Sequence, residues 1–197
     1  MPNWCSNVFT VMHSDSAMID RFIKGFEMNK LLGEFIPMPD ELMQSPRNLP
    51  SDVAEENIRK FGSPDWHAWA GVHWGTKWDV GEESGAIKRV DDNTVTGSFH
   101  SAWCAPRAAF KTLGEMGFVY TVVHSDPMTD YAAVSDNDGY QSFDSDFYVF
   151  ELKGVDWREV IPKSAHSVVE FWYSSYLEQK AEGYIVTSLL PEFGQEA

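Results

Sequence analysis

The chain has 197 residues, of which 43% are hydrophobic and 14% aromatic, so it can bury a sizeable core and global disorder is excluded. Its 30 Asp and Glu residues exceed its 15 Lys and Arg residues, which gives a formal net charge of −15 at pH 7. This balance disfavours a protein whose main role is to hold a phosphate backbone or an anionic membrane, because both need clustered cations.

The two cysteines, Cys5 and Cys104, are too few for a disulfide framework, and we expect two buried free thiols. The N-terminal residues show no basic segment followed by an apolar one, as a signal peptide would have. No run approaches the roughly 18 apolar residues that span a bilayer. The sequence therefore predicts a cytoplasmic protein that does not enter membranes.

The first elements are a strand and a helix. Residues 3–12 are rich in strand formers and alternate in character, which predicts a strand. Asp15 or Ser16 can cap a helix that extends to about Glu27, along which apolar residues recur at helical spacing.

Residues 31–93 are less regular and predict a long, aromatic-rich insertion. Within it we expect a short helix over 52–61, capped by Ser51 or Asp52. The aromatic segment 66–79 follows, and then a polar stretch rich in Gly, Glu and Asp.

After the insertion, residues 94–101 alternate again and predict a strand. Pro106 suits the first turn of a helix that Gly117 would end, and residues 118–124 predict the next strand. Two more strands are expected over 130–135 and 143–151, around a turn at 136–139.

A last helix is expected in the tail, over about residues 167–182. The order strand, helix, insertion, strand, helix, strand, strand predicts a ferredoxin-like α+β fold, with helices on one face of an antiparallel sheet. We expect one domain over residues 1–153, and a helical extension over 154–197 packed on the same domain.

Several segments share a recognisable pattern: Trp4-Cys5-Ser6-Asn7-Val8-Phe9-Thr10-Val11, Phe35-Ile36-Pro37-Met38-Pro39-Asp40-Glu41-Leu42, Trp74-Gly75-Thr76-Lys77-Trp78-Asp79 and Phe99-His100-Ser101-Ala102-Trp103-Cys104-Ala105-Pro106. Together they resemble the YubB-type family of phages, plasmids and integrated elements, over about residues 3–150. The resemblance implies a ferredoxin-like fold and an origin in a mobile element, and it implies no activity.

The hexapeptide 74–79 has two interpretations. If it is extended, Trp74, Thr76 and Trp78 share one side and Lys77 and Asp79 the other. The structural interpretation makes the indoles anchors and the two charged residues an ion pair. The functional interpretation is an aromatic-walled pocket for a ligand with a π-face. The predicted ligand-binding residues are Trp74, Thr76, Lys77, Trp78, Asp79 and Trp103.

No Lys or Arg occurs between Lys111 and Lys153, although the span is rich in acids. Carboxylates on a rigid sheet edge could imitate nucleic-acid phosphates and occupy a basic site on a host enzyme. The alternatives are a charge that only keeps the protein soluble, or a turn that binds calcium without being an EF-hand. The predicted interaction surface comprises Asp136, Asp138, Asp144 and Asp146.

Motifs for a serine nucleophile elbow, a phosphate-binding loop or a dinucleotide-binding loop are absent from the sequence. No histidine spacing demands zinc, so we predict neither a metal nor a cofactor. Acid and base groups need no local signature, which leaves an enzyme open. The residues that a small hydrolase would use are His73, Asp79, His100 and His124.

The leading hypothesis is an accessory protein of a phage or similar element that binds a host component, as an acidic inhibitor or nucleic-acid mimic with an anti-defence role. The partner would be a host protein, such as a nucleic-acid-processing or defence enzyme, and neither duplex nucleic acid nor a membrane is expected. The alternative is sequestration of a nucleotide-like small molecule in the Trp-rich segment. The cations expected to serve it are Lys77, Lys88, Arg89 and Arg107. Stacking of single-stranded bases on the sheet is disfavoured by the net charge.

Overall fold

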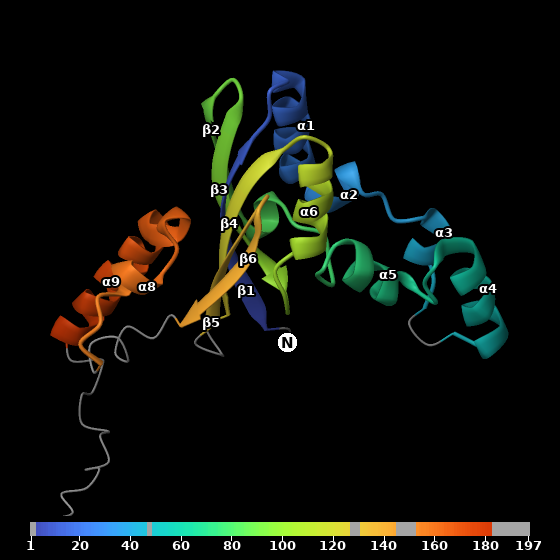
Figure 1. Cartoon of the computed structure of the whole chain (residues 1–197). Helices are drawn as coiled ribbons and strands as arrows, with labels where there is room; N and C mark the ends of the chain where they lie inside the picture. Colours follow the sequence, from blue (N-terminus) through green and yellow to red (C-terminus); the bar gives the residue numbers. More distant parts are fainter. Residues whose placement is uncertain (1–2, 47–48, 127–130, 145–152, 183–197) are drawn as a thin grey trace, which may run out of the picture. The chain divides into compact units, whose positions relative to one another are not determined.

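The computed structural model describes residues 3–46, 49–126, 131–144 and 153–182 (Figure 1). The chain divides into two compact units, residues 1–145 and 146–197. The predicted boundary at residue 153, and the packing of the tail on the first domain, stay predictions.

A six-stranded antiparallel sheet forms the first unit, in the order β2-β3-β1-β4-β5-β6. The strands are β1 (Trp4–Met12), β2 (Gly85–Asp91), β3 (Thr94–Ala102), β4 (Val119–Asp126), β5 (Tyr131–Asp136) and β6 (Gly139–Asp144). The first four have the ferredoxin-like arrangement, and the β5–β6 hairpin extends the sheet beyond β4. The predicted α+β fold is confirmed.

Two helices cover one face of this sheet, α1 (Ser16–Glu27) and α6 (Arg107–Glu115), as Figure 1 shows. The Asp15 carboxylate accepts a hydrogen bond from the Ala17 N–H at 2.9 Å, so the predicted cap of α1 is confirmed. Gly117 follows α6 with a φ of +95°, a backbone conformation that favours glycine and ends the helix as predicted.

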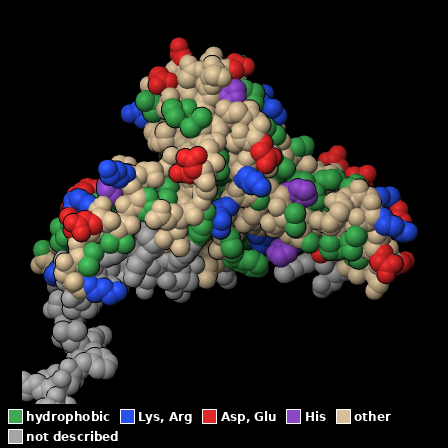
Figure 2. Space-filling model, in the orientation of Figure 1, with side chains coloured by type: hydrophobic (Ala, Val, Ile, Leu, Met, Phe, Trp, Pro, Cys, Tyr) green, Lys and Arg blue, Asp and Glu red, His purple; other side chains and the backbone are tan. Residues whose placement is uncertain are grey.

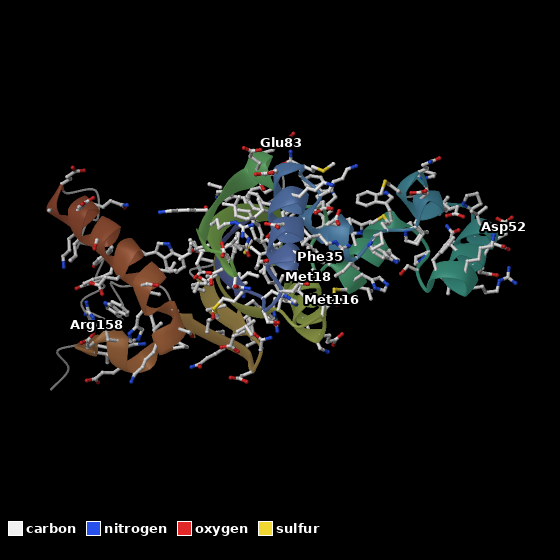
Figure 3. The ribbon with its side chains drawn as sticks, turned by 90° about the horizontal axis from the view of Figure 1, so that it is seen from above. Met18, Phe35, Asp52, Glu83, Met116 and Arg158 are labelled. Carbon is white, nitrogen blue, oxygen red and sulfur yellow. The ribbon has the colours of Figure 1, made fainter. Side chains whose placement is uncertain are left out.

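The core lies between this face and the helices. Phe9 on β1 stands at its centre, and its ring lies 5.7 Å from that of Phe22 and 5.8 Å from that of Phe99. Phe35 lies beside α1 in Figure 3, with its ring 6.2 Å from Phe22 and 5.4 Å from Phe118. Burying each such ring stabilises the fold by roughly 1.5–3 kcal/mol.

The insertion between α1 and the sheet contains four short helices and a 3₁₀ turn at Glu82–Ser84. The helices are α2 (Leu31–Phe35), α3 (Asp40–Met43), α4 (Ser51–Phe61) and α5 (Trp66–His73). Helix α4 matches its prediction, but Pro50 stands at its N-cap and neither Ser51 nor Asp52 caps it through a side chain. Figure 3 shows Asp52 on α4, away from the sheet.

The insertion ends earlier than predicted. Residues 85–91 were expected to continue a polar stretch, but they form the edge strand β2, paired with β3. Most of the strand is exposed and it carries Lys88 and Arg89. Charged residues are typical of edge strands, and here they hide the alternation that marks a half-buried one.

The turn predicted at 136–139 is present, with an Asp136 carboxylate oxygen accepting from the N–H groups of Asp138 and Gly139 at 2.9 and 3.0 Å. Strand β6 begins at Gly139, four residues before the predicted strand 143–151, because the tight turn lets pairing resume at once. Residues 145–151 lie outside the described residues.

The second unit contains α8 (Trp157–Val160), a 3₁₀ turn at Lys163–Ala165 and α9 (His166–Ala181), which confirms the predicted tail helix. Trp157 is buried, and Arg158 donates to both carboxylate oxygens of Glu170 at 2.8 Å. Across the described residues, no helix has both the length and the apolar character that crossing a bilayer requires.

Candidate ligand-binding groove

The hexapeptide 74–79 follows α5 as an irregular turn, not as a strand. Trp74 is buried, and its indole N–H donates to the carbonyl of Ile36 at 3.0 Å. The Trp74 carbonyl accepts from the N–H of Ala109 in the first turns of α6, at 3.2 Å. Trp74 therefore joins the insertion to α6.

The next two residues extend this connection. Gly75 has a φ of +82°, and a Cβ there would lie 3.1 Å from the backbone nitrogens of Arg107 and Ala108. The position thus needs glycine for both its conformation and its close contact with α6. The buried Thr76 hydroxyl donates to the carbonyl of Ala102, at the end of β3, at 2.9 Å.

Asp79 caps a distant helix. Its carboxylate accepts hydrogen bonds from the N–H groups of Leu32 at 2.7 Å and Gly33 at 2.8 Å, at the start of α2. Burial raises the pKa of Asp79, and these backbone donors offset part of that effect. The ion pair with Lys77 that the structural interpretation expected is not formed, because the carboxylate faces α2 instead.

Three of the six predicted ligand-binding residues gather elsewhere, on the surface. The Lys77 ammonium lies 4.3 Å from the ring centroid of Trp78 and 5.0 Å from that of Trp103. Trp78 is 39% exposed and Trp103 45% exposed. Trp4, 45% exposed, lies 5.9 Å from Trp78 between ring centroids. These three tryptophans and Lys77 are named the indole cluster.

A separate groove of about 610 Å³ lies between α6 and the β5–β6 hairpin, and we name it the α6–hairpin groove. This volume falls within the usual range for ligand pockets. Its lining comes from Gly75, the residues before α6, the first turns of α6, β4 and the hairpin. The lining residues are Gly75, Cys104, Ala105, Arg107, Ala108, Lys111, Tyr120, Ser135, Asp136, Asn137, Asp138, Gly139 and Tyr140.

The groove is charged on both walls. On the α6 wall, the guanidinium carbon of Arg107 lies 3.5 Å from the centroid of the Tyr140 ring, and Lys111 follows one turn later. Asp136 and Asp138 lie on the hairpin wall. Tyr120 lines the groove too, and its pKa is raised by burial and by Asp136, against a smaller opposing effect of Arg107.

A buried histidine lies next to this groove. Nε2 of His124 is in hydrogen-bond contact with the hydroxyl of Ser135 at 3.1 Å, and the His124 ring stacks on Tyr140 with 5.8 Å between centroids. Burial, with a smaller contribution from the Arg107 charge, lowers the pKa of His124 to about 4. The imidazole is therefore neutral at pH 7.

The other histidines named in the sequence lie apart. His73 stacks on Trp69 at 4.3 Å, and Nδ1 of His100 lies 3.1 Å from the carbonyl of Ser84. His100 and His124 stand on opposite faces of the sheet, since His124 pairs with buried Asn7 and His100 with its neighbour Ser6. Within the part of the chain that the structure describes, no group of three His, Cys, Asp or Glu side chains could hold a metal ion.

The cysteine prediction is half correct. Cys5 is buried, as predicted, but Cys104 is exposed at the edge of the groove. Cys104 lies in the loop before α6, outside the sheet that buries Cys5.

The predicted acidic surface is described only in part. Asp136 uses one carboxylate oxygen in the turn, and Asp138 is exposed at the hairpin tip. Asp144 is the last residue of β6, and Asp146 lies outside the described residues. Asp136 and Asp138 line the same groove as Arg107 and Lys111, which the charge pattern along the sequence did not indicate.

Sequence reasoning identified Arg107 as a cation for a phosphate, but it missed Lys111, Tyr140 and Ser135. None of these residues belongs to a motif, and they converge only when the hairpin pairs with β4 beside α6. The one usable signal was Pro106, which predicts a helix whose first turn carries Arg107.

No family model and no curated protein matches this chain. Among solved structures, it is similar to the crystal structure of a protein api92 from Yersinia pseudotuberculosis, described under the family model DUF1281. The two chains are 10% identical with a TM-score of 0.45, over 73% of this chain and 98% of the other.

Proposed function

We propose that this chain is a binding protein that holds a small, anionic, nucleotide-like molecule in the α6–hairpin groove. The observation that carries the proposal is the convergence of two exposed cations, Arg107 and Lys111, with the rings of Tyr120 and Tyr140 around a cavity of about 610 Å³. The ligand class is the one expected for the Trp-rich segment, but the site is a different one.

The cations are suited to an anionic group. Stacking on Tyr140 holds the Arg107 guanidinium, whose planar donor edge can bind a phosphate or carboxylate through two parallel hydrogen bonds. Lys111 stands four residues later, on the same side of α6. Neither cation forms an ion pair with a carboxylate among the described residues.

The hairpin wall adds selectivity. Asp138 and the free oxygen of Asp136 can accept hydrogen bonds from amino or hydroxyl groups of a ligand. The same acids repel a group of high negative charge, so we expect a monophosphate to bind better than a triphosphate. Asn137 contributes less, because its amide already binds the backbone of Tyr120 and Phe118.

The test is calorimetric titration of the full chain with AMP, CMP, GMP and UMP, followed by ATP. Charge-assisted hydrogen bonds contribute roughly 1.5–3 kcal/mol each, so Arg107→Ala should weaken binding by at least about tenfold. Lys111→Ala should weaken it too, without disturbing Tyr140. Lys88→Ala, which removes an equal charge from exposed strand β2, is the matched control and should bind as the wild type does.

Absence of binding at about 10 mM of every nucleotide would overturn the proposal, since affinities weaker than this have no recognition value. Equal affinities of the two groove variants and the Lys88→Ala control would overturn it as well.

Binding of a host component by a cytoplasmic accessory protein of a mobile element stays a prediction, as does a small hydrolase. The geometry favours acidic mimicry less than a ligand site, because Arg107 and Lys111 oppose Asp136 and Asp138 across one groove. Figure 2 shows acidic and basic side chains interspersed on the visible face of the first unit.

A further inference from the structure

The Lys77 ammonium lies over the faces of two tryptophan rings. The Nζ atom lies 4.3 Å from the centroid of Trp78 and 5.0 Å from that of Trp103, both within the range of a cation–π interaction. This pair of rings therefore already accepts a primary alkylammonium carried on a flexible side chain.

Trp103 is held in position by its backbone. Its φ is +72°, a left-handed conformation that is unfavourable for a bulky residue, and its N–H donates to the carbonyl of Asn3 at 2.8 Å. His67 meets the Trp103 ring edge-on, with 5.8 Å between ring centroids. The strained backbone and the ring contact fix one wall of the pair before any partner binds.

The pair is accessible from solvent. Trp78 and Trp103 are 39% and 45% exposed, and Trp4 adjoins Trp78 with 45% exposure. Exposed indoles are uncommon on protein surfaces, whereas tryptophan is enriched among the residues that dominate protein interfaces. The net charge of −15 attracts a basic partner at long range.

We propose that Trp78 and Trp103 form a binding site for a lysine side chain of a basic protein partner, and that Lys77 occupies this site until the partner arrives. An exposed cation–π contact is weak, so an incoming lysine can displace Lys77 at small cost. This site is separate from the α6–hairpin groove and requires a different class of partner.

The test uses two capped tripeptides, N-acetyl-Gly-Lys-Gly-amide and its norleucine analogue, which has the same chain without the charge. Binding to the full-length protein is followed by the indole N–H signals in NMR spectra. Lys77→Met removes the competing ammonium at nearly constant volume and should tighten binding of the lysine peptide by about two- to fivefold. Trp103→Gly suits the positive φ, removes the ring and should abolish binding.

Lys88→Met changes the net charge equally at an exposed position on β2 and is the matched control. If Lys77→Met and Lys88→Met bind the lysine peptide with equal affinity, the proposal that the peptide displaces Lys77 is overturned. Equal binding of the norleucine peptide would overturn recognition of the charge. Choline, titrated in parallel, tests a small quaternary ammonium as the occupant, and tighter binding of choline than of the lysine peptide would overturn the assignment to a protein partner.

Discussion

The hexapeptide 74–79 and the α6–hairpin groove use their polar groups in opposite ways. In the hexapeptide, the side chains of Trp74, Thr76 and Asp79 bind backbone groups of two other segments, helix α2 with its C-cap residue and strand β3. In the groove, Arg107 and Lys111 leave their charges toward solvent. The first region is contiguous and conspicuous in the sequence, whereas the second is assembled from dispersed and ordinary residues.

This difference shows that a conspicuous sequence motif can reflect contacts within the protein and not a ligand-binding site. The hexapeptide contacts α2, α6 and β3, so its residue types are dictated by packing and capping at fixed points. Of the six residues in the hexapeptide, only Lys77 and Trp78 have surface side chains that are left to recognise a partner. Substitutions in the two regions should therefore separate effects on stability from effects on binding.

The largest expected effect is on stability, at Asp79. Asp79→Ala leaves the N–H groups of Leu32 and Gly33 without their acceptor, and should lower the free energy of unfolding by about 3 kcal/mol. Arg107→Ala in the groove should change it by less than about 1 kcal/mol, because that side chain is exposed. Urea unfolding followed by tryptophan fluorescence measures the free energy of unfolding of both variants. If Asp79→Ala and Arg107→Ala lower it by similar amounts, the two regions do not differ in the way described.

An effect of similar size is the pH dependence of stability that His124 causes beside the groove. Its pKa is about 4 in the folded protein against 6.5 when unfolded, so the unfolded state binds more protons between these values. Neutral His124 contributes roughly 3 kcal/mol to the free energy of unfolding. This contribution is complete above about pH 6.5 and is lost as the pH falls toward 4.

Comparison of wild type with His124→Gln isolates this contribution, because the many carboxylates titrate in both proteins. The free energy of unfolding, measured with urea, should fall more between pH 7.5 and pH 4.5 in the wild type than in His124→Gln. Parallel losses in the two proteins would mean that His124 titrates normally.

The smallest effect is expected where the two regions meet, at Gly75. Gly75→Ala forces a Cβ onto a residue with a φ of +82° and within 3.1 Å of the Arg107 backbone nitrogen. We expect a loss of about 1–2 kcal/mol in stability and weaker nucleotide binding, because the first turn of α6 must shift. Gly62→Ala, at another positive φ with nothing within 4 Å, is the control and should leave nucleotide binding unchanged.

The prediction of local elements succeeded where the signal was local. The cap at Asp15, the turn at 136–139 and the end of α6 near Gly117 all follow from hydrogen bonds or φ values within a few residues. The prediction failed at strand β2, because an edge strand is stabilised by pairing with β3 and keeps its charged residues exposed.

The sequence by itself determined the α+β class, most of the strands, the helices α1, α4, α6 and α9, and the excess of negative charge. Only the tertiary structure decided which charges face one another and which polar groups are buried. Asp136 lies 29 residues after Arg107, yet both line one groove, and Asp79 caps a helix that begins 48 residues before it. Propensities and caps act over a few residues, whereas desolvation and charge pairing depend on neighbours brought together by the sheet.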